Sequence, residues 1–428
     1  MLTNALKGLA RVAWMIVALA IVVVPAWAAS TKQVALLSGA KATLRQIATR
    51  TLVPNFGNTS NHQMMSRRGA KASVNISSLQ IVIPNWYVAA QSGTAQTGVE
   101  TAAGGSATVT ASIEYPANTF KQVTFQGSSS GSIPSGGNIT SDVVGISIPK
   151  GSIFYVRIFF VNSTAIIYSN SNGYGTYPVA NSYYGDVINA AASGLSDQTM
   201  GGTISSVTTN ATFGPTAIIA KTTAQSLCLI GDSRVFGYND NPDSSGDVGS
   251  VARSVGGNYA YINMGVGSDR IAWWVASHTN RLALTSYCSR VVVELGINDL
   301  HDAGYTAAQT LSAQQTLYAL MPNLPKWQTT LEPESTSSDG WATPTSPSGN
   351  PGDQATSSIN AARVAVNTAI RSVPAQLRGF LEVANQIESG VNTGIWQAPG
   401  FTIDGIHEVQ KGYLAIQSSG VINPLAFH

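Results

Sequence analysis

Charged residues are scarce in this chain. Only 10% of its 428 residues are Asp, Glu, Lys or Arg, and the formal net charge is +2. No stripe of Lys and Arg occurs, so the sequence offers no electrostatic basis for binding nucleic acid. Gly, Ser, Thr and Asn take the place of charged residues, which suits an exported protein rich in β-structure. The hydrophobic content of 44% is enough for two domains with their own cores.

Cysteine is scarce as well, since Cys228 and Cys288 are the only two. Two cysteines are too few for a disulfide framework or a zinc site. Each lies at the start of a predicted strand. The sequence leaves two alternatives open, a pair of buried free thiols or a single disulfide between neighbouring strands.

The first 28 residues have the three-part layout of a secretory signal peptide. Lys7 and Arg11 precede an apolar run over residues 12–24, and Ala-Trp-Ala at 26–28 forms a small-x-small cleavage site. We therefore expect cleavage near Ala28, a secreted or periplasmic protein, and no stable membrane insertion after cleavage. A single membrane anchor is the alternative, although the run is near the short end of the roughly 17–25 residues that a spanning helix needs.

Residues 29–222 are predicted to form an all-β sandwich domain that is jelly-roll-like. Apolar and polar side chains alternate over residues 107–115 and again over 154–160, which is the period of a half-buried strand. Turn-forming stretches such as PSGGN and IPKG separate these runs, and no convincing helix interrupts them. Residues 29–70 are less regular and are interpreted partly as a linker. A carbohydrate-binding or accessory role is one interpretation of this domain.

Residues 223–428 follow a different pattern. Short apolar runs (LCLI, YINM, VVVEL, QTTL and FLEV) alternate with helix-like stretches, of which residues 307–321 and 357–373 are the clearest. Strands that alternate with helices predict a parallel, doubly wound α/β sheet. A long Pro-, Ser- and Gly-rich loop over residues 332–354 follows one of these strands, and loops of that length are usually functional or disordered.

Polar residues follow four of the predicted strands, and the carboxyl ends of parallel strands meet at one edge of a sheet. Ser233 follows the first strand, the turn at residues 263–269 the second, and Asn298 the third. Asp404 and His407 come after the last. The sequence therefore predicts that a hydroxyl, a glycine-rich turn, a carboxamide and an Asp/His pair share one rim.

These residue types match the needs of acyl transfer. A serine hydroxyl becomes a good nucleophile when an imidazole takes its proton, and a carboxylate on the other ring nitrogen fixes the tautomer. The Asn298 amide and the backbone N–H groups of Ser233 and of residues 265–268 are suitable donors to an oxyanion. Each motif alone is weak, because Gly-Asp-Ser is common in turns and Asn-Asp can cap a helix.

The histidines narrow the choice of base, because the chain has only five. His62 lies in the other half, His428 is the last residue, and His278 falls in a probable helix. His301 is the one serious rival to His407, but its neighbour Asp302 is adjacent in sequence and poorly placed to orient its ring.

Together the blocks GDS, NMGVGSD, ELGIND and DGIH resemble those of the SGNH (GDSL-type) hydrolase family of esterases and lipases, over roughly residues 225–428. The resemblance implies a flavodoxin-like three-layer α/β/α fold and a carboxylic ester hydrolase that needs no metal or cofactor. It also implies that Ser233 is the nucleophile, His407 the base and Asp404 its orienting acid, with Ser233 and Asn298 as oxyanion donors.

The second block departs from the pattern of the family. The oxyanion glycine of the family usually stands directly before the Asp, where this chain has Ser268. Either Gly267 takes the role through a shifted turn, or Ser268 donates its own N–H. Both alternatives stay open at the level of the sequence.

An exported β-sandwich followed by a hydrolase, with no long apolar lid, favours O-acetyl groups on carbohydrate over lipid as the substrate. Aromatic residues in polar loops, such as Trp341, could stack on sugar rings, or they could be ordinary turn and core residues. The other members of this group are Tyr174, Tyr177, Tyr183 and Tyr184. A lipase or thioesterase of the same fold, and a glycan-binding or adhesion protein with an inactive hydrolase half, are the alternatives.

Arg234 is unusual beside the predicted nucleophile, where many members of the family have an apolar residue. Its side chain must reach solvent, a carboxylate or an anionic group of the substrate. We therefore name Arg234, with Trp341, as a candidate for contact with the substrate, and a carboxylate partner is the plainer alternative.

Overall fold

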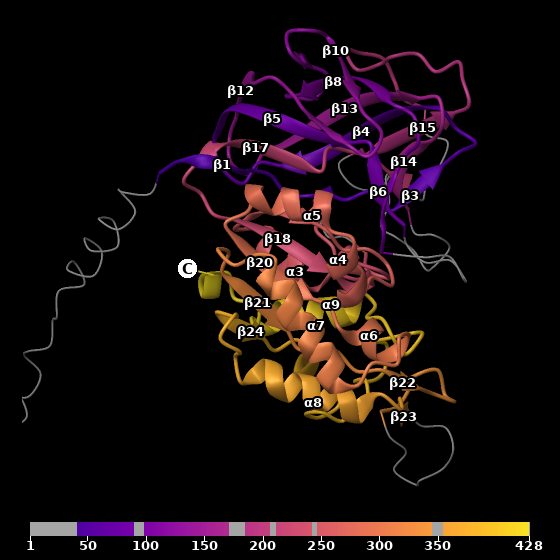
Figure 1. The fold of residues 1–428 in the computed structure, drawn as a ribbon, viewed down its shortest axis with the longest axis vertical. Helices are drawn as coiled ribbons and strands as arrows, with labels where there is room; N and C mark the ends of the chain where they lie inside the picture. The colour runs from indigo at the N-terminus through magenta and orange to yellow at the C-terminus, as the bar shows by residue number, and fades with distance from the viewer. Residues whose placement is uncertain are drawn as a thin grey trace, which may run out of the picture. The chain divides into compact units, whose positions relative to one another are not determined.

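Two antiparallel sheets face each other in the first part of the chain (Figure 1). One sheet has the strand order β10-β8-β13-β4-β15, with β9 also paired to β8; the other has the order β1-β17-β5-β11, with β12 also paired to β5. The strands of the first sheet are β10 (Ser130–Ile133), β8 (Ala107–Glu114), β13 (Ile153–Asn162), β4 (Gln63–Lys71), β15 (Val187–Ala191) and β9 (Phe120–Val123). The strands of the second sheet are β1 (Thr43–Gln46), β17 (Ala217–Thr222), β5 (Ile76–Pro84), β11 (Asn138–Thr140) and β12 (Val144–Ile148).

The computed structural model describes residues 41–89, 98–170, 185–205, 211–241, 246–344 and 354–427. The described residues from Leu44 onward belong to one compact unit, which includes the predicted boundary near residue 222. The predicted signal peptide and the tyrosines at 174, 177, 183 and 184 lie outside the described residues. In the part of the chain that is described, no helix is both long and apolar enough to cross a membrane.

Alternation of side chains builds the core of the sandwich, as the sequence predicts. In β13 the side chains of Phe154, Val156, Ile158 and Phe160 are all buried, and they join one continuous apolar cluster between the sheets. Two smaller pairings complete this half. They are the sheet β16-β14-β3 (Ala211–Thr212, Ile166–Asn170, Phe56–Asn58) and the hairpin β6-β7 (Trp86–Val88, Glu100–Ala102).

The second part of the chain forms a parallel sheet with the order β2-β19-β18-β20-β21-β24. Without β2, this is the 2-1-3-4-5 order of a flavodoxin-like fold, as the sequence predicts. The predicted strands correspond to β18, β19, β20, β21 and β24, with bounds Ser226–Gly231, Ala260–Asn263, Arg290–Glu294, Lys326–Thr329 and Gly379–Leu381.

Helices cover both faces of this sheet and make the three layers. Alternate residues of β18 separate into two cores: Cys228 and Ile230 face one, Leu227 and Leu229 the other. The first core includes side chains of α4, α5 and α7, and the second includes those of α3 and α9. These helices are α3 (Ser250–Val255), α4 (Ile271–Ala276), α5 (Thr279–Leu284), α7 (Ala307–Ala319) and α9 (Gln410–Ser419). Helix α8 (Asn360–Arg371) packs on α7.

The interpretation of residues 29–70 as partly a linker is wrong for their described portion. Residues 43–71 contain β1 to β4, and β2 (Thr51–Leu52) is the edge strand of the hydrolase sheet, parallel to β19. Two residues are too short a run to show a strand period, so the pattern could not reveal this pairing.

A disulfide joins Cys228 of β18 to Cys288, which lies just before β20. Because β18 and β20 are parallel neighbours, the two cysteines stand side by side at the amino ends of these strands, with Cα atoms 5.6 Å apart. The bond closes a sequence separation of 60 residues, and such cross-links stabilise a fold by about 2–5 kcal/mol.

Candidate active site

The turn after β18 places Ser233 at a strand end. α2 (Ser233–Phe236) begins two residues after the strand, and the Asp232 carboxylate caps it by accepting a hydrogen bond of 3.0 Å from the Arg234 N–H. A Cβ on Gly231 would lie 2.2 Å from Val235, so glycine is required for the close approach of strand and helix. The serine side chain is thus held at the edge of the sheet by the backbone around it.

Ser233, His407 and Asp404 form a continuous chain of hydrogen bonds. Ser233 Oγ lies 2.8 Å from His407 Nε2, and His407 Nδ1 lies 2.8 Å from Asp404 Oδ2. Both distances fall in the range of about 2.6–3.2 Å that a nucleophile and its base require. With Nδ1–H donating to the carboxylate, Nε2 is left to accept the proton of the serine.

The loop at residues 402–408 is shaped by its own hydrogen bonds. Asp404 Oδ1 accepts the backbone N–H groups of Ile406 and His407, at 2.9 and 2.8 Å. The Thr402 hydroxyl accepts the N–H of Gly405, which has a φ of +76° and lies against the carbonyl of another segment. The three-residue spacing of Asp and His on such a turn brings carboxylate and ring side by side, as the sequence predicts.

Electrostatics keep the base neutral and its partner charged. Burial lowers the pKa of His407; the Asp404 carboxylate opposes this shift, and the nearby Arg234 charge adds to it. Burial alone would raise the pKa of Asp404, but the hydrogen bond and charge of His407, with two backbone N–H groups, bring it well below its ordinary value. At neutral pH, His407 is therefore free to take a proton.

Two further residues support the histidine, and no sequence pattern pointed to either. The Tyr238 ring packs on the His407 ring, with centroids 4.4 Å apart, and Asn239 Nδ2 lies 3.4 Å from Asp404 Oδ2. Both follow Gly237, whose left-handed backbone ends α2. They contact the triad because a short helix turns the chain back across the loop, which sequence spacing alone does not reveal.

The structure narrows the choice of oxyanion donors in the 265–268 turn. The N–H of Gly265 donates to Asn263 Oδ1, and that of Val266 donates to the Gly231 carbonyl. Within the described part of the chain, the N–H groups of Gly267 and Ser268 have no acceptor, and neither has that of Ser233.

Ser268 occupies the sequence position of the family's glycine, and its own backbone conformation is one that glycine favours. Its φ is +60°, in the left-handed region that favours glycine. The turn is closed by the Asp269 N–H, which donates to the Val266 carbonyl at 3.1 Å. Of the two alternatives, the geometry favours Ser268 as the counterpart of that glycine, because a shifted turn is not needed.

Asn298 lies in the first turn of α6 (Ile297–His301), at the end of β20. Its Nδ2 donates to the Asp269 carbonyl at 3.0 Å and lies 3.4 Å from Asp232 Oδ2. The second contact is long, so one N–H of the amide could turn to a substrate oxygen at small cost. The role of Asn298 as an oxyanion donor stays a prediction.

The segment at residues 98–102, which contains β7, supports the turn at residues 265–268 through Arg281. Arg281 Nη1 lies 2.6 Å from Asp269 Oδ2, and both side chains are fully buried. Glu100 of β7 accepts the backbone N–H of Arg281 at 2.7 Å, and Arg281 Nη2 donates to the Gly98 carbonyl. Glu100 and Gly98 are therefore linked through Arg281 to Asp269, the residue directly after Ser268, although they lie far from it in the sequence.

The prediction that Arg234 contacts substrate is wrong. Its side chain is only 1% exposed, and it points into the protein beside Glu332 and Glu408, whose Oε2 atoms lie 3.7 and 3.6 Å from Nε. The carboxylate partner, the plainer alternative, is present.

Trp341 belongs to the long loop that the sequence singled out. Its Nε1 donates to the Ser335 hydroxyl, and its ring lies against Gly405, between Asp404 and His407. Trp341 is half-buried and so could still contact a substrate, which remains a prediction. β22 (Ser335–Thr336) and β23 (Ala355–Thr356) pair at the base of this loop.

His301, the rival base, is paired elsewhere. Its Nδ1 contacts Glu334 Oε1, and its Nε2 lies 3.7 Å from Asp302 Oδ1. Ser233 is bonded to His407 instead, so the structure separates the two candidates. In the described ranges, no group of three or more His, Cys, Asp or Glu side chains could hold a metal ion.

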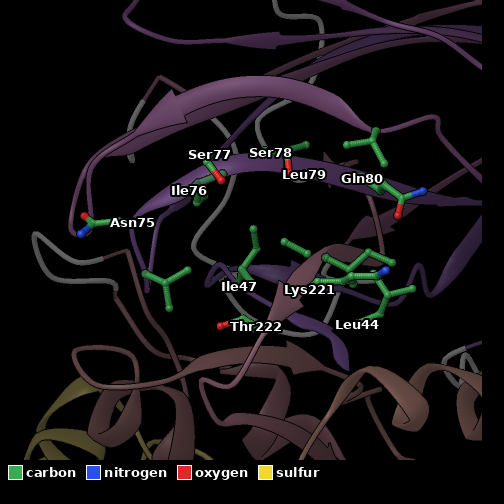
Figure 2. A pocket seen from close by; sticks show the side chains of 14 residues that line it. Leu44, Ile47, Asn75, Ile76, Ser77, Ser78, Leu79, Gln80, Lys221 and Thr222 are labelled. Atoms are coloured by element: carbon green, nitrogen blue, oxygen red, sulfur yellow. The ribbon is translucent and has the colours of Figure 1, made fainter. Parts of the chain in front are cut away.

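A cavity of about 350 Å³ lies in the sandwich, between β5 and β17 (Figure 2). Figure 2 shows Ile47 and Leu79 at its apolar wall and Lys221 at its rim. None of its lining residues is aromatic, and none belongs to the triad. It therefore lacks the ring surface on which a sugar would stack.

No protein-family model and no curated protein matches the sequence. Solved structures similar to the chain include a member of the lipolytic G-D-S-L family from Veillonella parvula, at 14% identity and a TM-score of 0.33, covering 46% of this chain and 97% of that one. A Bacillus subtilis protein covers 82% of this chain and 78% of its own, at 13% identity and a TM-score of 0.36. An acetylxylan esterase from Geobacillus stearothermophilus has 15% identity and a TM-score of 0.30, and the match covers 46% of this chain and 94% of that one. These scores are too low to carry an argument, so function rests on the geometry of the site.

Proposed function

We propose that the protein is a serine esterase that removes short acyl groups, O-acetyl groups on carbohydrate above all. The observation that carries the proposal is the hydrogen-bonded chain of Ser233, His407 and Asp404, with 2.8 Å at each link. The backbone N–H groups of Ser233 and Ser268, which have no acceptor among the described residues, support it, because acyl transfer requires donors to the oxyanion.

The reaction follows from this geometry. Ser233 Oγ attacks the ester carbonyl while its proton moves to His407 Nε2, and the carbonyl oxygen takes the negative charge toward the free N–H groups. The Asp404 carboxylate stabilises the imidazolium. His407 then gives the proton to the departing alcohol oxygen, which leaves an acyl-Ser233 ester. A water molecule, deprotonated by His407, attacks that ester, releases the carboxylic acid and restores the serine.

Hydrolysis of p-nitrophenyl acetate by the purified protein tests the proposal. We expect Ser233→Ala to lower kcat by about 10⁴-fold or more, because loss of a triad member removes the nucleophile or its base. Ser254→Ala is the matched control, since this serine lies on α3 and its hydroxyl bonds only the Ser250 carbonyl. Hydrolysis that survives in Ser233→Ala would overturn the proposal.

The choice of substrate rests on weaker support. The predicted signal peptide and the disulfide between Cys228 and Cys288 fit an oxidising, extracytoplasmic compartment, where acylated polysaccharides occur. We expect acetate release from acetylated glycans, and acetyl esters to be cleaved faster than long-chain esters. Faster cleavage of long-chain esters or of thioesters would favour a lipase or thioesterase.

A glycan-binding protein with an inactive hydrolase half is the second candidate. The aromatic-free cavity of the sandwich does not favour it. Binding of acetylated glycan with no turnover by the full-length protein would establish it and would contradict the esterase.

A further inference from the structure

We infer that Arg234 is a positioning residue that holds the loop of His407 against Ser233. The inference rests on the proposed function, because it concerns the same nucleophile and base. Its basis is a contact network beneath the triad that neither residue type nor spacing shows in the sequence.

The position of Arg234 in the chain makes it a direct link between the two residues. It is peptide-bonded to Ser233, and its Nη2 donates at 2.5 Å to the carbonyl of Ile406, which is peptide-bonded to His407. Its Nε lies 3.6 Å from a carboxylate oxygen of Glu408, the residue on the other side of His407. One guanidinium thus contacts both chain neighbours of the base.

Other contacts hold the loop at a different point. Trp396 Nε1 donates to the Gly405 carbonyl at 2.9 Å, and Gly405 also accepts the backbone N–H of Ser335. These bonds fix the Asp404 side of the loop. The Ile406–Glu408 side, which carries the imidazole, is bonded by Arg234 from below.

Arg234 is also the cation of a buried acidic cluster. Its charge is favoured by four carboxylates, those of Glu332, Glu408, Asp232 and Glu294. Glu332 follows β21, Glu294 ends β20 and Asp232 caps α2, so the guanidinium joins three strand ends to the histidine loop. A side chain in this place with no charge would take from Asp232 and Glu408 the cation that favours their ionised forms, whereas Glu332 also interacts with Arg363.

The charge of Arg234 also acts on the base. The groups that face His407 are Asp404 and Glu408 on its own loop, and Arg234 and the Tyr238 ring from the segment that contains α2. Arg234 lowers the pKa of the imidazole, whereas Asp404 raises it. Loss of the guanidinium should therefore both loosen the loop and make His407 easier to protonate.

Three variants and a matched control separate positioning from simple destabilisation. Arg234→Met keeps the length and removes the charge; Arg234→Lys keeps the charge but not the forked donor. Arg234→Met combined with Glu408→Gln keeps the test usable if the single variant fails to fold. Arg157→Met removes an equally buried arginine from the sandwich, where it pairs with Glu114 at 2.9 Å.

The full-length variants are compared by kcat and KM for p-nitrophenyl acetate, by thermal unfolding, and by the low-field proton NMR signal of the Nδ1–H between His407 and Asp404. In folded Arg234→Met we expect kcat to fall by about 10²-fold with KM changed only a few-fold, the cost of a misplaced catalytic group. The acid limb of kcat/KM should move to higher pH, and the NMR signal should shift or broaden. Arg234→Lys should recover part of kcat, and Arg157→Met should lower thermal stability alone.

A folded Arg234→Met protein with kcat within about twofold of the parent and an unchanged NMR signal would overturn the inference. If the parent hydrolyses no ester, the proposed function fails, and the NMR signal then decides the positioning by itself. A signal that differs from the parent in Arg234→Met but not in Arg157→Met supports the positioning role. A signal that differs from the parent equally in both variants, or in neither, overturns that role.

Discussion

Buried charges are arranged in opposite ways in the two halves of the molecule. In the sandwich, one carboxylate faces two arginines: Glu114 lies 2.7 Å from Arg67 Nε and 2.9 Å from Arg157 Nε. Beneath the triad, Arg234 faces four carboxylates, of which Glu332 also interacts with Arg363. The clusters differ in the ratio of cations to acids and also in contact, because Arg67 and Arg157 hydrogen-bond Glu114, whereas Arg234 Nε lies 3.6–3.7 Å from Glu408 and Glu332.

The direct hydrogen bonds and the ratio of cations to acids together decide whether the acids are ionised. Burial would raise the pKa of Glu114, but the hydrogen bonds from Arg67, Asn118 and Arg157 lower it to about 2. Burial raises the pKa of Asp232 to about 7 and that of Glu408 to about 8, and the single Arg234 offsets this only in part. The sandwich cluster is thus a fixed ionic cross-link, whereas the cluster at the site holds protons in the neutral range.

The largest effect is expected from breaking the cross-link in the sandwich. Glu114→Gln leaves Arg67 and Arg157 without their anion, and loss of one partner of a buried pair costs about 3–5 kcal/mol of unfolding free energy. Urea unfolding measures it. Glu382→Gln is the control: its pair with Arg371 is about one-fifth exposed on each side, so we expect a loss within about 1 kcal/mol. Equal losses in the two variants would contradict the comparison.

An intermediate effect, dependent on pH, is expected at the acidic cluster. The folded protein keeps a proton on Glu408 up to about pH 8, whereas an unfolded glutamic acid releases it near its ordinary pKa of 4.5. The folded state therefore binds more protons between these values, and its stability falls as pH rises from about 4.5 to 8.

Glu408→Gln removes the contribution of this one group to that fall. The unfolding free energy of the variant should depend less steeply on pH than that of the parent, with the gain largest at pH 8 and above. Urea unfolding at a series of pH values checks the slope. A slope that stays the same or becomes steeper would show that Glu408 is ionised in the folded protein at neutral pH.

The smallest effect concerns the backbone at a single residue. Many turns of the molecule place glycine at positive φ, as at Gly127 and Gly151, whereas the turn at residues 265–268 places Ser268 there. Ser268→Gly should raise the unfolding free energy by up to about 1 kcal/mol through relief of this strain. It should leave kcat/KM nearly unchanged, because the N–H is kept. A tenfold loss of kcat/KM would instead give the Ser268 side chain a role in the reaction.

Much of the site could be predicted because parallel strands converge at their carboxyl ends. That rule brings Ser233 and the 263–269 turn to one edge, and the short spacing of Asp404 and His407 favours their contact. The rule is silent on the direction of each side chain. It therefore failed for Arg234, which lies beside the nucleophile in sequence but points beneath it, and it offered no sign of Glu100 or Arg281.

The sequence by itself determined the alternation of the sandwich strands, the alternation of strands and helices in the second half and the residue types of the triad, because these depend on local periodicity and on the chemistry of each side chain. Only the tertiary structure decided the pairing of β2 with the hydrolase sheet, the disulfide and the cluster around Arg234. These features join segments far apart in the chain, and their geometry is set by packing, which no local pattern encodes.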